Sequence, residues 1–222
     1  MSLTVKICGL STEETLDAAL AAGADMVGFV FFPRSPRFVS AEVAARLAGR
    51  ARGRAEIAAL AVDMDDAELS AVIDAVAPDW LQLHGRETPE RVADIRRRFK
   101  RRTMKAIGVS TADDLTAAEM YAAVADMLLM DAKPPKEATR PGGNGQTFDW
   151  RIVRGFAPAV PYLLSGGLTP ANVAEAIRIT GATGVDVSSG VESAPGRKDP
   201  TLIRAFIANA RAAARQPEKA AS

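Results

Sequence analysis

The stretch that decides the fold is Val5–Thr15, VKICGLSTEET, in which an apolar run leads through a glycine into the start of a helix. The chain's only cysteine, Cys8, ends the apolar run. Ser11 and Glu14 have the spacing of a capping box, in which the two residues bind each other's backbone N–H groups at a helix start. The stretch therefore predicts a strand, a turn and a helix, with a thiol at the carboxyl end of the strand.

The same alternation of an apolar run and an amphipathic, alanine-rich segment continues almost to the end of the chain. The runs are continuously apolar, which is typical of parallel strands buried on both faces. Eight such units without a break in composition predict a single α/β domain, a (β/α)8 TIM barrel over residues 1–214, followed by a frayed tail at 215–222. An open doubly wound sheet is the alternative, but the first turn lacks the G-x-G-x-x-G pattern of dinucleotide-binding sheets. The expected strands are Leu3–Cys8, Met26–Phe32, Ile57–Val62, Trp80–His84, Met104–Val109, Met127–Asp131, Tyr162–Ser165 and Val185–Ser188.

The composition is that of an ordinary globular protein, with 48% apolar and 25% charged residues in a chain of 222. A formal net charge of +1 gives no general attraction to nucleic acid or to an anionic membrane. One cysteine and one histidine exclude an internal disulfide, a multi-thiolate metal site and a histidine-cluster metal site. The N-terminus lacks the features of a signal peptide, and no apolar run approaches the roughly 18–20 residues of a membrane span. We therefore expect a cytoplasmic protein, and the sequence does not decide whether it forms a homodimer.

The loops after the seventh and eighth expected strands are rich in glycine and serine. In a TIM barrel the active site lies at the carboxyl ends of the strands, and these two loops are the usual phosphate site. Glycines let backbone N–H groups approach an anion, and a helix expected to open at Thr169–Pro170 adds a partial positive charge. The alternative is that both loops are turns that merely need unusual dihedral angles. The predicted phosphate site consists of Ser165, Gly166, Gly167, Ser188, Ser189 and Gly190.

Two reactive side chains end other strands. Cys8 taken alone would be a small core hydrophobe, but its place at a strand end, followed at once by Gly9, favours a role in the site. Asp131 ends an apolar run, where a carboxylate needs a partner or a function. Pairing with the nearby Lys133 is the alternative for Asp131.

Three further polar residues are candidates for the same site. Arg37 follows the second strand in a proline-rich loop, where its guanidinium could hold a carboxylate through two hydrogen bonds. His84 follows the fourth strand and is more typical of a hydrogen-bonded structural group than of a base. Asp186 lies on the last strand and could equally bind neighbouring backbone N–H groups.

In this order along the chain, the motifs resemble the phosphoribosylanthranilate isomerase family of tryptophan biosynthesis. The resemblance extends from Lys6 to Asp199, and the ordered set of motifs is far more specific than any one of them. Asn144 and Gln146 depart from the residues that are common in the family's glycine-rich loop. The motifs are VKICGL, GADMVGFVFFPRSPRFVS, LQLHG, MLLMDA, GGNGQTFDW, LSGGLTPANV and VDVSSGVESAPGRKD.

The resemblance implies a TIM barrel that converts N-(5-phosphoribosyl)anthranilate, a small phosphosugar, to 1-(2-carboxyphenylamino)-1-deoxyribulose 5-phosphate by an acid–base Amadori rearrangement. It assigns Cys8 as general base, Asp131 as general acid and Arg37 to the anthranilate carboxylate. No metal or cofactor is expected, because the substrate's own nitrogen serves as the electron sink. The long loop at 132–146, with Gly143 and Gly145, is expected to close over the substrate.

A base at neutral pH requires a thiolate, so we expect the site to lower the pKa of Cys8, for example through the neighbouring Lys6. His84 and Asp186 are candidates for positioning the substrate.

Four other functions are compatible with parts of the pattern. The sister isomerase of histidine biosynthesis performs the same rearrangement but carries an aspartate where Cys8 stands. A non-catalytic phosphosugar-binding barrel would leave Cys8 unreactive. A metal-dependent epimerase would need several histidines, and a Schiff-base aldolase could use Lys105.

Overall fold

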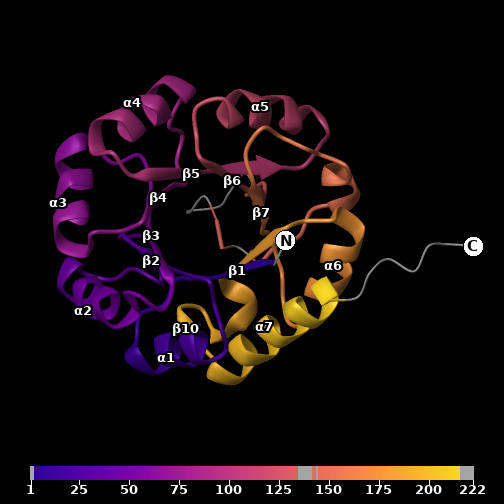
Figure 1. Ribbon diagram of the computed structural model, residues 1–222, viewed down its shortest axis with the longest axis horizontal. Helices are drawn as coiled ribbons and strands as arrows, with labels where there is room; N and C mark the ends of the chain where they lie inside the picture. Colours follow the sequence, from indigo (N-terminus) through magenta and orange to yellow (C-terminus); the bar gives the residue numbers. More distant parts are fainter. Residues whose placement is uncertain (1–2, 135–141, 144, 216–222) are drawn as a thin grey trace, which may run out of the picture.

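The computed structural model describes residues 3–134, 142–143 and 145–215. Eight parallel strands close into a barrel in chain order, from β1 to β8, and helices surround it (Figure 1). The predicted TIM barrel is therefore confirmed, and each expected strand is present with slightly shifted ends. The strands are β1 Thr4–Cys8, β2 Met26–Val30, β3 Glu56–Ala61, β4 Trp80–Leu83, β5 Arg102–Val109, β6 Met127–Ala132, β7 Tyr162–Leu164 and β8 Gly184–Val187.

Helices follow most of the strands and cover the outside of the barrel. Between β6 and β7, the only helix among the described residues is the 3-10 helix η1, Trp150–Val153. A second 3-10 helix, η2 (Ser189–Val191), and a small hairpin of β9 (Glu192–Ala194) and β10 (Arg197–Lys198) follow β8. The α-helices are α1 Glu13–Ala21, α2 Ala41–Ala51, α3 Asp66–Val76, α4 Pro89–Phe99, α5 Asp113–Ala122, α6 Val173–Thr180 and α7 Pro200–Arg215.

Two expected helix starts are wrong by one to four residues. The N-cap of α1 is Thr12, not Ser11, because the Thr12 hydroxyl accepts from the Thr15 N–H and also contacts the Thr15 hydroxyl at 2.8 Å. Helix α6 begins at Val173, not at Thr169–Pro170. The Asn172 side chain holds the preceding residues in a turn, since it accepts from the Thr169 N–H and donates to the Gly167 carbonyl.

The alternation of side chains along each strand separates two layers. Residues such as Val5 and Ile7 face the helices and belong to the main apolar core. A second cluster lies inside the barrel and includes Met26, Trp80 and Leu163. These side chains fill the barrel below the carboxyl ends of the strands, so the barrel is a packed core rather than a pore.

Polar residues continue the inward-facing rows above this apolar layer. Lys6 alternates with Val5 and Ile7 on β1, Gln82 follows Trp80 by two residues on β4, and Asp186 follows Gly184 by two on β8. All three are buried, with exposed fractions of 0%, 0% and 4%. The strand period of two therefore delivers buried polar groups to the carboxyl end of the barrel. None of the described helices has the length and apolar character needed to cross a membrane.

Two exposed glycines provide a matched test of the backbone. An alanine side chain at Gly49 or Gly53 would meet no other atom within 4 Å, but Gly53 has a φ of +76° whereas Gly49 lies inside α2. We expect Gly49→Ala to stabilise the fold by about 1 kcal/mol, because alanine is the better helix former. Gly53→Ala is expected to destabilise it by about 1–2 kcal/mol, because a Cβ disfavours left-handed backbone. Urea unfolding measures both changes, and equal shifts of the same sign would contradict this account.

Candidate active site

One cavity at the carboxyl ends of the strands brings together nearly all of the residues singled out in the sequence. Gly190 is the exception: a Cβ there would lie 1.8 Å from the Leu168 carbonyl oxygen, so this glycine packs against the β7–α6 loop instead. Gln82 also lines the cavity and was missed, although a polar residue in an inward-facing strand position was a signal. The predicted residues in the lining are Cys8, Arg37, His84, Asp131, Gly143, Gly145, Ser165, Gly166, Gly167, Asp186, Ser188 and Ser189.

Cys8 lies beside a buried ion pair. The Lys6 Nζ donates to the Asp186 Oδ1 over 2.7 Å, and the Ser165 hydroxyl donates to the other Asp186 oxygen over 3.3 Å. Gly28 makes room for this group, because a Cβ on it would lie 2.9 Å from the Cys8 sulfur and 3.3 Å from the Lys6 Nζ. The thiol and the ammonium group therefore pack against the same point of β2.

The electrostatics of Cys8 differ from expectation. Burial is the largest influence and raises the pKa of the thiol, and Asp186 raises it further. Lys6 and the more distant Lys198 lower it, but the net pKa of Cys8 lies above its ordinary value. Burial disfavours the charge on Lys6 as well, but the Asp186 carboxylate outweighs this and raises the pKa of Lys6. The prediction of a lowered thiol pKa was wrong because it counted the cation and not the desolvation.

Asp131 ends β6 with its carboxyl group in the cavity. Its Oδ1 accepts from the Ala132 N–H over 2.8 Å, and its Oδ2 lies 3.3 Å from the His84 Nε2. Lys133, the alternative partner, pairs instead with Asp114 over 3.1 Å. The carboxyl group of Asp131 thus contacts a histidine and a backbone N–H, not a lysine.

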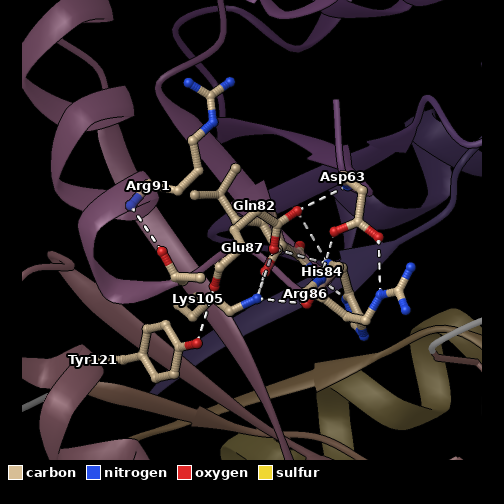
Figure 2. A network of polar contacts seen from close by, with 11 residues as sticks. Asp63, Gln82, His84, Arg86, Glu87, Arg91, Lys105 and Tyr121 are labelled. Carbon is tan, nitrogen blue, oxygen red and sulfur yellow. Dashed lines mark hydrogen bonds and ion pairs between the residues drawn. The ribbon is translucent and has the colours of Figure 1, made fainter. Parts of the chain in front are cut away.

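The loop that carries His84 is held by a buried ion pair outside the barrel wall (Figure 2). The Lys105 Nζ donates to the Leu83 and Gly85 carbonyls over 3.3 and 2.7 Å and to Glu87 over 2.6 Å. Glu87 in turn accepts from the Gly85 N–H. Lys105 therefore binds the backbone carbonyl groups on both sides of His84.

Arg37 forms one arm of a buried charge cluster. Its guanidinium donates two hydrogen bonds to Glu192, over 2.7 and 2.9 Å. Lys198 also donates to Glu192, over 2.6 Å, and to the Ser188 carbonyl, over 2.9 Å. Arg37 and Lys198 outweigh the burial of Glu192 and lower the pKa of its carboxyl, whereas burial lowers the pKa of Lys198. Two cations share one carboxylate, and this leaves a net positive charge beside the cavity, as suits an anionic ligand.

The glycine-rich loops approach their neighbours too closely for any side chain. Gly167 has a φ of +64°, and a Cβ on it would lie 2.4 Å from Thr147. A Cβ on Gly166 would lie 2.6 Å from the Ala132 backbone nitrogen. These contacts place the loop after β7 directly against the segment that follows Asp131.

The described glycines of the 132–146 loop lie close to three different parts of the cavity wall. A Cβ on Gly142 would lie 2.5 Å from the His84 Nε2 and 2.9 Å from the Asp131 Oδ2. The Gly143 carbonyl accepts from Arg37 over 3.4 Å. Gly145 lies near the Ser189 hydroxyl. Residues 135–141 and Asn144 of this loop lie outside the described residues, as does 216–222 of the expected tail.

Comparisons with known proteins agree with one another. A family model described as N-(5'phosphoribosyl)anthranilate (PRA) isomerase matches residues 5–209. The N-(5'-phosphoribosyl)anthranilate isomerase of Rhodopseudomonas palustris strain BisA53 is 62% identical over 215 residues, which cover 97% of this chain and 99% of the relative. The phosphoribosyl anthranilate isomerase structure from Thermotoga maritima is 37% identical, with a TM-score of 0.85 and coverage of 95% of this chain and 99% of that one. A phosphoribosyl anthranilate isomerase solved in complex with reduced 1-(o-carboxyphenylamino)-1-deoxyribulose 5-phosphate is 34% identical, with a TM-score of 0.82 and the same coverage.

The single cysteine makes the thiol titration directly measurable. We expect the thiolate absorbance of the chain, read as a difference spectrum against Cys8→Ala, to appear with a midpoint above the ordinary cysteine pKa of about 8.5. Lys6→Met should move the midpoint higher, because it removes the cation that favours the thiolate. Lys100→Met, an exposed change at the C-cap of α4, should leave it in place. A midpoint below 8.5 in the unaltered chain would contradict the burial argument.

Proposed function

This chain belongs to the N-(5'-phosphoribosyl)anthranilate isomerase family, and we propose that Cys8 and Asp131 carry the two proton transfers of its reaction. The chain is an isomerase of tryptophan biosynthesis, which converts N-(5'-phosphoribosyl)anthranilate to 1-(2-carboxyphenylamino)-1-deoxyribulose 5-phosphate. The observation that carries the assignment is the shared cavity, in which a buried thiol and a buried carboxyl group face the same space as two glycine-rich loops.

The chemistry requires an acid first and a base second. Asp131 donates its proton to the furanose ring oxygen, the C1–O bond breaks, and the nitrogen lone pair forms an iminium ion. The Cys8 thiolate then removes the C2 proton, and the electrons of that bond flow toward the nitrogen to give an enol-amine. Addition of a proton at C1 and loss of the proton from the C2 hydroxyl then give the ketone. A thiol with a raised pKa supplies less thiolate at neutral pH, but that thiolate is the stronger base.

We assign the two anionic ends of the substrate to two parts of the cavity. We assign the anthranilate carboxylate to Arg37, whose charge is only partly neutralised because Glu192 is shared with Lys198. We assign the phosphate to the loops of Ser165, Gly166 and Gly167 and of Ser188 and Ser189. Gly190 supports this site by letting the two loops approach each other rather than by touching the ligand.

We further propose that the segment around Gly142–Gly145 closes the cavity over the bound sugar. The Gly143 carbonyl accepts from the proposed carboxylate arginine, and a side chain on Gly142 or Gly145 would meet the proposed acid or a proposed phosphate serine. Closure would exclude water from the iminium intermediate. A cytoplasmic location for the enzyme stays a prediction from the sequence.

The alternatives are weaker than the isomerase assignment. The family match favours an enzyme over a non-catalytic barrel. The histidine-pathway isomerase would need an aspartate where Cys8 stands. Lys105, the candidate Schiff-base lysine, is 2% exposed and bound to Glu87, so its amine is not presented to a carbonyl substrate.

Removal of either proton-transfer group should nearly abolish turnover. We expect Cys8→Ala and Asp131→Asn each to lower kcat about 10²–10⁴-fold, the usual contribution of a positioned acid or base. The loss of anthranilate fluorescence as phosphoribosylanthranilate is consumed measures the rate. Excess chelator should not change the rate of the unaltered enzyme. Near-normal turnover in either variant, with an unaltered circular dichroism spectrum, would reject that residue's role.

Arg37 should matter only for substrates that carry a carboxylate. We expect Arg37→Met to lower kcat/KM for phosphoribosylanthranilate about 10–100-fold, because hydrogen bonds between charged groups contribute about 1.5–3 kcal/mol. The same change should alter kcat/KM for the phosphoribosyl derivative of aniline much less. Arg34→Met, in the same loop but exposed, is the matched control. Equal losses on both substrates would show that Arg37 supports the loop rather than reading the carboxylate.

A further inference from the structure

A chain of side-chain contacts runs from the floor of the cavity to the proposed acid. The Gln82 Nε2 lies 3.1 Å from the His84 Nδ1, and the His84 Nε2 lies 3.3 Å from the Asp131 Oδ2. Gln82 is fully buried, and all three residues line the cavity. Gln82 therefore reaches Asp131 only through the ring of His84.

The identity of the glutamine atom determines the state of the ring. An amide nitrogen can donate a hydrogen bond but cannot accept one. With the Gln82 Nε2 facing the His84 Nδ1 over 3.1 Å, that ring nitrogen is the acceptor and carries no hydrogen. The hydrogen of the neutral ring is then on Nε2, which lies 3.3 Å from the Asp131 Oδ2.

This tautomer has a direct consequence for the acid. With a hydrogen on Nε2, His84 has no lone pair there with which to take the acid's proton. In the opposite tautomer, Asp131 would donate its proton to Nε2, and the proton would be held by the imidazole. By keeping a hydrogen on Nε2, the glutamine removes His84 as an acceptor, so that the proton of Asp131 can pass to the ring oxygen of the substrate.

The backbone around His84 is held in place from the other side. Lys105 binds the carbonyl groups of the residues before and after His84, and Glu87 neutralises Lys105 in an ion pair with both side chains about 3% exposed (Figure 2). Tyr121 adds a hydrogen bond to the Glu87 carbonyl over 2.9 Å. The backbone that carries His84 is therefore held independently of Gln82. A change at Gln82 can then alter the state of the ring without displacing the loop.

The oxygen of the Gln82 amide is available to a ligand. Among the described residues, the Gln82 Oε1 is a buried acceptor without a hydrogen-bond partner. A buried, unsatisfied acceptor costs about 1–3 kcal/mol, so a donor on a bound ligand would stabilise it. A hydroxyl or amine N–H of the substrate in this cavity would hold the amide with its oxygen toward the ligand and its nitrogen toward His84.

We propose that Gln82 is a positioning residue that holds His84 as the Nε2–H tautomer, so that the ring nitrogen 3.3 Å from the Asp131 carboxyl group cannot take its proton. This inference rests on the proposed role of Asp131 as the general acid. It gives a function to a residue for which the isomerase assignment alone has no use.

The single histidine of the chain allows a direct test by nitrogen NMR. In the enzyme labelled with 15N-histidine, at about pH 8 where free imidazole is neutral, we expect Nδ1 to show the shift of an unprotonated ring nitrogen and Nε2 that of a protonated one. In Gln82→Glu the carboxylate can only accept, so Nδ1 should become protonated. Gln82→Met removes the partner and should give a mixture of tautomers. Both variants should lower kcat about 10–100-fold, less than the loss of the acid itself.

Controls separate this inference from the proposed function. Glu119→Gln, an exposed carboxylate-to-amide change on α5, should leave both the NMR shifts and kcat unchanged. If Gln82→Glu does not fold, the near-isosteric Gln82→Met still tests the proposal. A protonated Nδ1 in the unaltered enzyme, or a Gln82→Met variant that keeps both tautomer and kcat, would overturn it. Near-normal activity of Asp131→Asn would instead overturn the acid assignment on which it rests.

Discussion

The ion pair between Lys6 and Asp186 lies at the seam where the barrel closes, and the site is built around it. The two residues are register partners on β1 and β8, and their charged groups meet 2.7 Å apart inside the barrel. Loss of one partner of such a buried pair typically costs about 3–5 kcal/mol, because the other charge is left unpaired. The lysine contacts the thiol side of the cavity, and the aspartate contacts Ser165 on the other side. The contact that joins β1 to β8 and closes the barrel therefore also brings the two sides of the site together.

Much of the fold and many of the site residues could be predicted because they depend on local pattern. The eight strands follow from apolar runs, and the position of Cys8 and Asp131 at strand ends places both in the cavity. The first residues of the helices were predicted less accurately. Ser11 and Thr12 can both serve as the N-cap of α1, and only the fold shows that Thr12 does so. The missed features depend on contacts between distant parts of the chain. Glu192 meets Arg37 across 155 residues, and Lys6 meets Asp186 across 180.

The direction of the thiol pKa could not be predicted from sequence for a related reason. A neighbouring lysine was visible in the motif, whereas the degree of burial and the opposing charge of Asp186 depend on barrel closure. Lys105 illustrates the same limit. Its place on β5 suggested a reactive amine, but its position between the inward-facing Met104 and Ala106 turns it outward, where Glu87 neutralises it. Whether a strand residue faces into or out of the barrel, rather than its type, therefore decides whether its side chain can contact the substrate or only stabilises the surrounding structure.

The sharing of Glu192 between Arg37 and Lys198 has a consequence for how this enzyme could acquire new substrates. Lys198 also binds the Ser188 carbonyl, and it lies next to Arg37, because both cations donate to the same Glu192 oxygen. A substitution that adapts the arginine to a different aryl group would remove two hydrogen bonds from Glu192 and disturb the lysine as well. Evolution toward other amines is therefore less obstructed along the apolar walls formed by Val30, Phe32, Leu60 and Val62, where side chains can vary in size without altering the charges.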